Sequence, residues 1–294
     1  MLILDGGIGR HLKKIGAPFG QPEWSALALI EDPLFVSQAH TDFINAGADI
    51  ITTNTYAIVP FHIGEKRFRE IGKELILKAA KIAQESSLSS KNEVKVAAGI
   101  PPVFGSYKPE SFVYKDALPI LELFKEYLLP SSDLVLAETL SCIEEIAAIQ
   151  NIFSNCGQPL WISLTLDDDL KDKSISNLRS GESLQKALES INFDNVDAVL
   201  FNCSQPEVME NALKITRRIV PSQILTGAYA NTFPSINSSQ KAANNQIREL
   251  RTELTPEVYK NFALSWIKAG ASIIGGCCGI GPEHIKELSK IKIS

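Results

Sequence analysis

The stretch DPLFVSQAHTDFINAGADIITTNT, residues 32–55, contains the repeating unit that decides the fold. Its first half places apolar side chains at helical spacing, at Phe35, Ala39, Phe43 and Ala46. Asp32 as the cap and Pro33 as the first helical residue form a typical helix start. Its second half, residues 49–55, is a β-branched run that predicts a strand. A helix followed by such a strand is the unit of an α/β protein.

The same alternation continues along the whole chain. Eight apolar or β-branched runs predict strands, at residues 2–5, 49–55, 94–100, 134–139, 160–166, 198–203, 224–230 and 272–277. Helical patterns lie between them, and strands that are apolar along most of their length suit a sheet buried on both faces. Eight such units in 294 residues predict a (β/α)₈ TIM barrel, formed as a single domain by residues 1–294. A doubly wound open sheet is the alternative.

Composition narrows the class of function. The chain is 45% hydrophobic, has a net charge of −5 and contains no dense Lys/Arg cluster, which argues against nucleic acid and anionic membrane as partners. The N-terminus lacks the apolar core of a signal peptide, and no run reaches the roughly 18 apolar residues of a membrane span. We therefore expect a cytoplasmic protein, in which five cysteines favour metal binding or catalysis over disulfides. The oligomeric state is left open.

The active site of such a barrel lies where the strands end, and three cysteines fall there. Cys203 ends the sixth predicted strand, and Cys277 with Cys278 ends the eighth, next to two glycines. Three thiolates with an open fourth position are typical of a catalytic zinc site. The alternative is that these cysteines are inert and buried, which is what we expect of the other two, Cys142 and Cys156.

Polar and aromatic residues share these strand ends. Carboxylates end strands one and four, at Asp5 and Glu138; they could act as an acid/base pair, bind a substrate ammonium or, for Asp5, cap a helix. An aromatic wall that holds a cationic ligand could be formed by Trp24, Tyr56, Phe104 and Tyr229, with ordinary packing as the alternative for each. Trp161 and Trp266 are expected in the core, and His284 is expected to face outward or to cap the last helix.

Five segments resemble the homocysteine S-methyltransferase family, which includes betaine-dependent enzymes and the homocysteine module of cobalamin-dependent methionine synthase. They are LDGGIGRHLKKIG (4–16), WSALALIEDPLFVSQAHTDFINAGADIITTNTY (24–56), LVLAETLSCIEEI (134–146), LFNCSQPE (200–207) and WIKAGASIIGGCCGIGPEHI (266–285). The resemblance implies a zinc-containing (β/α)₈ barrel that methylates homocysteine to methionine. It implies Cys203, Cys277 and Cys278 as zinc ligands. It also implies a set that holds the amino-acid end of homocysteine, namely Asp5 with Gly6 and Gly7, Thr53 and Glu138.

Two loops depart from the family pattern. AAGIPPVFGSY (97–107) stands where similar chains have a glycine-rich turn, and YANTFPSIN (229–237) keeps only Tyr229 and Asn231 of a YPNSGE-like sequence. Both loops are expected to shape the methyl-donor side, and residues 231–254 are expected to cover the barrel mouth. S-methylmethionine is the expected donor, because the compact chain leaves no room for a cobalamin domain. S-adenosylmethionine, betaine and a non-catalytic thiol-binding barrel are the alternatives.

A phosphate-binding barrel and a Schiff-base aldolase fit less well. The first could use Gly275, Gly276 and the start of the last helix, but it leaves the cysteines without a role. The second needs a lysine at a strand end, and no predicted strand ends in one.

Overall fold

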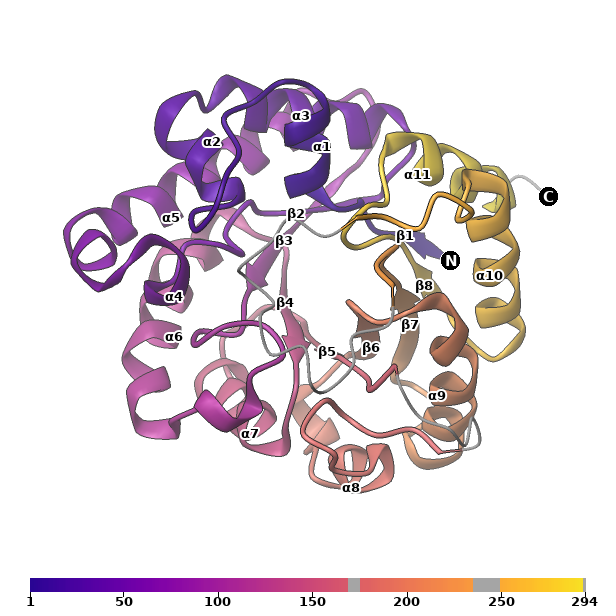
Figure 1. Ribbon diagram of the computed structural model, residues 1–294. Helices are drawn as coiled ribbons and strands as arrows, with labels where there is room; N and C mark the ends of the chain where they lie inside the picture. The colour runs from indigo at the N-terminus through magenta and orange to yellow at the C-terminus, as the bar shows by residue number, and fades with distance from the viewer. Residues whose placement is uncertain (169–174, 235–248, 293–294) are drawn as a thin grey trace.

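Eight parallel strands form one sheet in the computed structural model, which describes residues 1–168, 175–234 and 249–292. The strands are β1 (Leu2–Ile3), β2 (Ile50–Thr52), β3 (Lys95–Ile100), β4 (Leu134–Leu140), β5 (Leu160–Leu164), β6 (Ala198–Asn202), β7 (Leu225–Tyr229) and β8 (Ile273–Ile274). Their order is β1-β8-β7-β6-β5-β4-β3-β2, and a parallel bridge from Leu4 to Ile50 joins the two ends of this series. The sheet therefore closes on itself (Figure 1), so the TIM barrel is confirmed and the open sheet is excluded.

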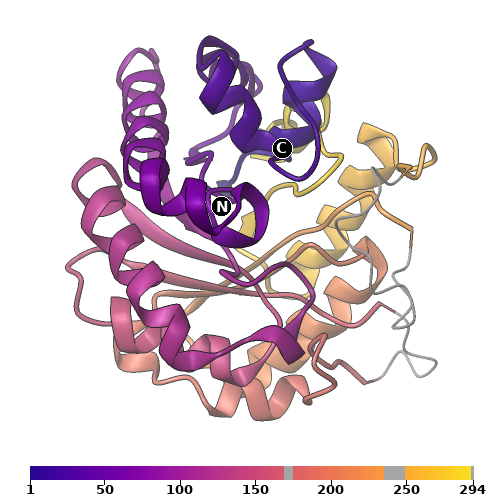
Figure 2. The ribbon, with the colours of Figure 1, turned by 60° about the vertical axis from the view of Figure 1, so that its left-hand side comes forward.

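Helices surround the sheet on its outer side (Figures 1 and 2). They are α1 (Ile8–Lys14), α2 (Ser25–Glu31), α3 (Leu34–Asn45), α4 (Pro60–Ile63), α5 (Glu65–Leu88), α6 (Tyr114–Leu128), α7 (Ile143–Phe153), α8 (Leu184–Glu189), α9 (Pro206–Ile219), α10 (Pro256–Lys268) and α11 (Pro282–Ser289). Short 3₁₀ turns cover Pro109–Ser111, Leu129–Ser131, Phe193–Asn195 and Lys290–Lys292. Among the helices so described, none has the length and apolar character that a membrane crossing needs.

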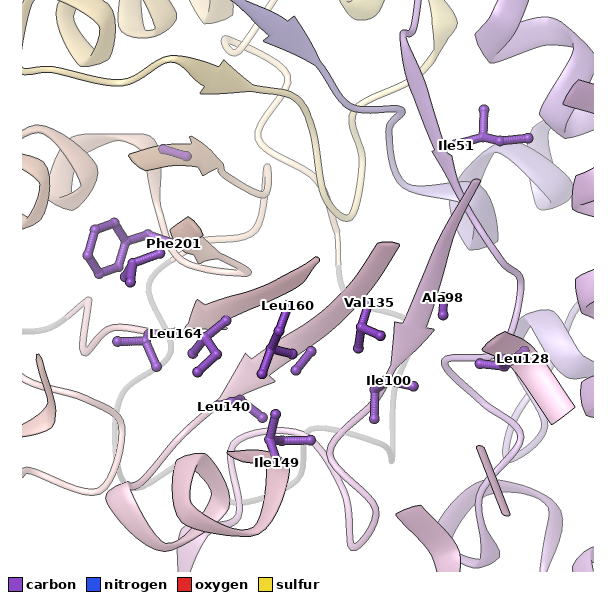
Figure 3. Close-up of a cluster of buried hydrophobic side chains, with 14 of the residues drawn as sticks. Ile51, Ala98, Ile100, Leu128, Val135, Leu140, Ile149, Leu160, Leu164 and Phe201 are labelled. Atoms are coloured by element: carbon purple, nitrogen blue, oxygen red, sulfur yellow. The ribbon is translucent and has the colours of Figure 1, made fainter. Parts of the chain in front are cut away.

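Alternation along the strands separates the core into two layers. Leu134 and Leu136 of β4 point into the barrel interior, where they pack in a small apolar cluster with residues from the other strands. Val135 and Ala137 belong to the larger cluster between sheet and helices. Figure 3 shows this outer layer, in which strand side chains such as Val135 lie with Leu128 of α6 and Ile149 of α7. Burial on both faces explains why the strands are apolar along most of their length.

Two helix starts show how local sequence sets the ends of elements. Thr255 caps α10 by accepting a hydrogen bond from Val258 N, and α3 begins at Leu34, one residue later than predicted. Trp161 and Trp266 lie in the core. His284 is buried and accepts a hydrogen bond from Gly281 N, so the capping alternative is confirmed and the outward-facing one is wrong.

Candidate functional site

The turn after β8 carries two of the three predicted metal ligands. β8 ends at Ile274, so Cys277 and Cys278 lie in the turn beyond it rather than in the predicted strand. Gly276 N donates to Asp5 O at 3.0 Å, and Cys277 N donates to Ala230 O at 2.9 Å. These two hydrogen bonds fix the turn between the ends of β1 and β7, at the mouth of the barrel.

Glycines let neighbouring segments approach this turn closely. A Cβ atom added to Gly7 would lie 2.5 Å from Cys277 O and 2.9 Å from Cys278 Cα. Gly276 packs against Ile280 without room for a side chain, and Gly279 has a φ of +87°, which glycine adopts readily. The glycines thus clear space around the cysteine pair, and Gly7 does so from the segment after β1.

The three thiol groups converge at this mouth. The Sγ atoms of Cys203, Cys277 and Cys278 all lie within 4.8 Å of one another, and tetrahedral zinc with Zn–S bonds of about 2.3 Å places sulfurs about 3.8 Å apart. The donor set therefore fits a soft divalent ion. The Sγ atoms of Cys203 and Cys277 are in direct contact, and Cys278 is a separate thiol. Cysteine binds a metal as the thiolate, so the metal-binding form is the one with all three cysteines reduced.

A buried clamp holds Cys203 in an uncommon backbone conformation. Cys203 has a φ of +50°, and its carbonyl oxygen accepts hydrogen bonds from Tyr107 Oη at 3.0 Å and from Arg179 Nη2 and Thr165 Oγ1, each at 3.4 Å. Arg179 also pairs with Asp168 at 2.6 Å, with side chains only 6% and 1% exposed. The Arg179 guanidinium lies 4.9 Å from the centre of the Tyr107 ring.

Strained backbone concentrates around the site. Within the residues that the structure describes, positive φ occurs at four non-glycine positions, namely Trp24, Tyr107, Thr139 and Cys203. Trp24, Tyr107 and Cys203 line one pocket, and Thr139 follows Glu138, which lines it too. Such conformations cost about 1–3 kcal/mol each and persist where surrounding contacts enforce them. Because the strained residues group at this pocket, the surrounding contacts must hold the backbone there in conformations that it would not otherwise adopt.

Two carboxylates, Asp5 and Glu138, line the pocket. Asp5 is 5% exposed and accepts hydrogen bonds from Thr52 N at 2.8 Å and Thr52 Oγ1 at 3.2 Å. Glu138 accepts a hydrogen bond from Tyr229 Oη at 3.3 Å. Burial raises the pKa of Asp5 to about 7, and burial together with the Asp5 charge raises the pKa of Glu138 to about 8. A cation placed between them would relieve this repulsion, so the pair is suited to an ammonium group.

Most of the predicted site residues line this one pocket. It contains the three cysteines together with Asp5, Gly6, Gly7, Trp24, Thr53, Tyr56, Glu138 and Tyr229. Asn231 is not among the described lining residues; it is buried, and its Oδ1 accepts a hydrogen bond from Phe233 N. Phe104 does not line the pocket either and packs edge-on against Phe112 at 6.0 Å. Most of the covering loop expected at 231–254 lies outside the described residues.

Several lining residues were not predicted. Arg10 follows the Asp-Gly-Gly segment by one helical turn, so its position in α1 was a usable signal. Ser106 and Tyr107 come from the loop after β3, and Phe233 comes from the loop after β7. These loops have no periodicity that predicts where a side chain points, so their contribution became visible only in three dimensions.

Comparison with known proteins identifies the family. The sequence model described as "Homocysteine S-methyltransferase" matches residues 2–291. This chain belongs to the homocysteine S-methyltransferase family. Homocysteine S-methyltransferase 1 of Brassica oleracea var. italica is 29% identical to it, over 98% of this chain and 92% of that relative. Selenocysteine methyltransferase of Astragalus bisulcatus is 26% identical, over 98% of this chain and 91% of that one.

A solved structure supports the fold. The metallated form of the homocysteine methyltransferase MmuM from Escherichia coli matches with a TM-score of 0.78 at 23% identity, covering 99% of this chain and 96% of that one. At 23% sequence identity this match supports the barrel fold and nothing more specific. Membership of the homocysteine S-methyltransferase family, together with relatives named as such enzymes, makes this chain a methyltransferase and confirms the sequence resemblance.

Proposed function

We propose that this protein transfers a methyl group from a sulfonium donor, foremost S-methylmethionine, to the thiol of homocysteine, with zinc held by Cys203, Cys277 and Cys278. The observation that carries the proposal is one pocket that combines three converging thiols with a pair of carboxylates. The thiols are the donor set that zinc prefers, and the carboxylates are complementary to an α-ammonium group. Relatives named for homocysteine support the acceptor.

Zinc bound by three thiolates would ionise the homocysteine thiol, which at an ordinary pKa near 8.5 is only a few per cent ionised at pH 7, a gain of about 30-fold. The chain's own residues do the rest. Asp5 and Glu138 bind the ammonium, and Thr53 with the Gly6–Gly7 segment lines the same pocket and completes the set that holds the amino-acid end of homocysteine. Orientation of sulfur and methyl carbon can contribute on the order of 7–11 kcal/mol, more than ionisation alone.

The reaction itself is a displacement at carbon. A lone pair of the homocysteine sulfur forms a bond to the donor methyl carbon, and the bond from that carbon to the sulfonium sulfur breaks. The bonding electrons return to the donor sulfur, which becomes a neutral thioether. With S-methylmethionine both products are methionine, and the thiol proton has already left to solvent. Trp24, Tyr56 and Tyr229 line the pocket and offer aromatic surface to the cationic donor.

A donor panel tests the proposal. Reduced, zinc-loaded protein is incubated with homocysteine and S-methylmethionine, S-adenosylmethionine or betaine, and methionine is quantified. We expect the greatest turnover with S-methylmethionine, about one zinc per chain, and loss of both zinc and turnover in Cys203→Ser and Cys277→Ser. Cys156→Ser is the matched control, because that cysteine lies outside the cluster. Full zinc and full transfer in the first two variants would disprove the proposal. Homocysteine binding without turnover of any donor would favour the non-catalytic barrel.

A further inference from the structure

The pocket carries one permanent positive charge that the reaction described above leaves without a role. Arg10 stands in the first turn of α1, and its guanidinium lies 5.5 Å from the centre of the Phe233 ring. Both side chains line the pocket. His62, also in the lining, has its pKa lowered to about 4 by burial and stays neutral. Among the described lining residues Arg10 is thus the single cationic side chain at neutral pH.

Arg10 and Glu138 stand on different sides of the barrel mouth. Arg10 follows β1 and its ring partner Phe233 follows β7, and these two strands flank β8, whose following turn carries Cys277 and Cys278. Glu138 lies on β4, four strands away from β8 in the closed sheet. The guanidinium therefore lies on the cysteine side of the pocket, across the barrel mouth from Glu138.

Displacement geometry assigns the two sides of the pocket to different substrates. In an in-line displacement the attacking sulfur and the leaving sulfur lie on opposite sides of the methyl carbon. If homocysteine extends from Glu138 to the cysteine cluster, the donor must extend onward from the cluster, away from Glu138. The wall formed by Arg10 and Phe233 stands on that side, because it follows β1 and β7, the strands that flank β8.

We propose that Arg10 is a specificity-determining residue that binds the carboxylate of the methyl donor, so that the site selects amino-acid-like sulfonium donors over simple sulfonium ions. A guanidinium and a carboxylate form a bidentate, charge-assisted pair. The pair also neutralises the donor's anionic group, which would otherwise be repelled by the thiolate cluster. The inference rests on the proposed function and adds the chemical class of the donor.

The chosen variants change charge and geometry separately. Arg10→Gln removes the charge, and Arg10→Lys keeps it without the bidentate fork. Lys14→Gln removes one charge from the same helix outside the pocket, where Lys14 forms an exposed pair with Glu283. Dissociation constants for S-methylmethionine and for homocysteine are measured separately by calorimetry on reduced, zinc-loaded protein, with zinc content checked for every variant.

We expect Arg10→Gln to weaken S-methylmethionine binding by about 10- to 100-fold, with Arg10→Lys in between and Lys14→Gln like the unmodified chain. Homocysteine affinity should stay within about twofold of its original value, a shift of less than 0.5 kcal/mol. With homocysteine present, the preference for S-methylmethionine over trimethylsulfonium, which has no carboxylate, should fall by the same factor. Unchanged S-methylmethionine binding in Arg10→Gln, or a loss that falls on homocysteine instead, would overturn the inference. Donor binding that depends on Arg10 without methionine formation would count against the proposed reaction and leave this binding site standing.

Discussion

Single residues at the mouth set how closely the chain can approach the proposed metal. Gly7 belongs to the segment after β1, yet the atoms that exclude a side chain there are Cys277 O and Cys278 Cα. The Asp-Gly-Gly sequence thereby has two roles: Asp5 lines the pocket, and Gly7 leaves room for the cysteines. Contacts of this kind tune a metal site through its ligands rather than by binding the ion.

Gly7→Ala should therefore loosen the metal site. The new methyl group must push the Cys277–Cys278 turn outward, because the backbone atoms it meets have no rotamer to change. We expect zinc affinity to fall by about 10- to 100-fold, measured by competition with a chromogenic chelator under reducing conditions. Gly20→Ala is the matched control, because its nearest contact is ordinary, 3.8 Å from Leu27 Cδ2. Equal affinities in both variants would refute the steric argument.

Glu138 is proposed to bind substrate, but its burial lowers the free energy of unfolding of the ligand-free protein at neutral and higher pH. Its pKa is about 8 in the folded chain, so between an ordinary glutamate pKa near 4.5 and pH 8 the native state holds a proton that the unfolded state has lost. Stability must then fall as the pH rises through this window. Burial is the main cause of the raised pKa; the charge of Asp5 adds to it, and the hydrogen bond from Tyr229 opposes it.

Glu138→Gln, which cannot ionise, should remove this penalty. We expect it to increase the free energy of unfolding at pH 8 by about 1–3 kcal/mol, with little change near pH 4.5, and to weaken homocysteine binding at least tenfold. Urea unfolding at several pH values measures the first effect and calorimetry the second. The exposed Glu110→Gln serves as the control. A variant whose stability follows the original pH profile would show that Glu138 is not the source.

At the scale of elements, the turn after β6 depends on loops from two other strands. The carbonyl of Cys203 collects donors from the loop after β3 and from the segment after β5, and Asp168 also accepts a hydrogen bond from Gln205 N at 2.8 Å. Together these contacts hold Cys203 at a φ of +50°, a conformation that non-glycine residues rarely adopt.

Weakening the clamp should release Cys203 without unfolding the barrel. Tyr107→Phe removes one hydrogen bond and keeps the ring, while Arg179→Met removes the charge and leaves Asp168 unpaired. We expect zinc affinity to fall about tenfold in the first variant and further in the second. Arg217→Met is the control, because Arg217 donates to Ile224 O away from the cluster. If affinity only follows the melting temperature of the metal-free protein across all three variants, the clamp has no specific role.

The same loops mark how far the sequence could predict the site. Asp5, Glu138 and Cys203, predicted at strand ends, lie in the pocket lining, because chain order and strand direction bring such positions to one rim of a parallel barrel. Tyr107 also lines the pocket but was not predicted, and Phe104 of the same loop packs outside the lining. The direction of a loop side chain depends on contacts such as Tyr107 with Cys203 O, and no local pattern encodes these. That residues 1–294 form a single domain stays a prediction.

On the scale of the whole molecule, the barrel closes where its strands are shortest. β1 and β8 each contribute two residues, and the link from β1 to β2 is a single bridge between Leu4 and Ile50. The cysteine turn lies next to this seam and is tied to Asp5 after β1 and Ala230 after β7. An ion shared by Cys203 and the turn would join β6 to β8 across a sequence separation of 74 residues. The metal would thus cross-link the barrel close to its weakest point.

Zinc should therefore stabilise the reduced protein measurably. At a free zinc concentration of 100 times the dissociation constant, linkage predicts about 2.7 kcal/mol, which corresponds to roughly 4–5 °C in melting temperature for a chain of 294 residues. The increment should grow with pH, because the thiols must lose protons to bind, and burial raises the pKa of Cys278 to about 11. Calorimetric scans with zinc and with a chelator measure it. Cys278→Ser should abolish the rise in melting temperature and Cys156→Ser should keep it, because of these two cysteines only Cys278 belongs to the cluster. If zinc still raised the melting temperature of Cys278→Ser, the stabilising ion would bind elsewhere. The ion at the cysteine cluster would then not be what stabilises the junction of β1 and β8.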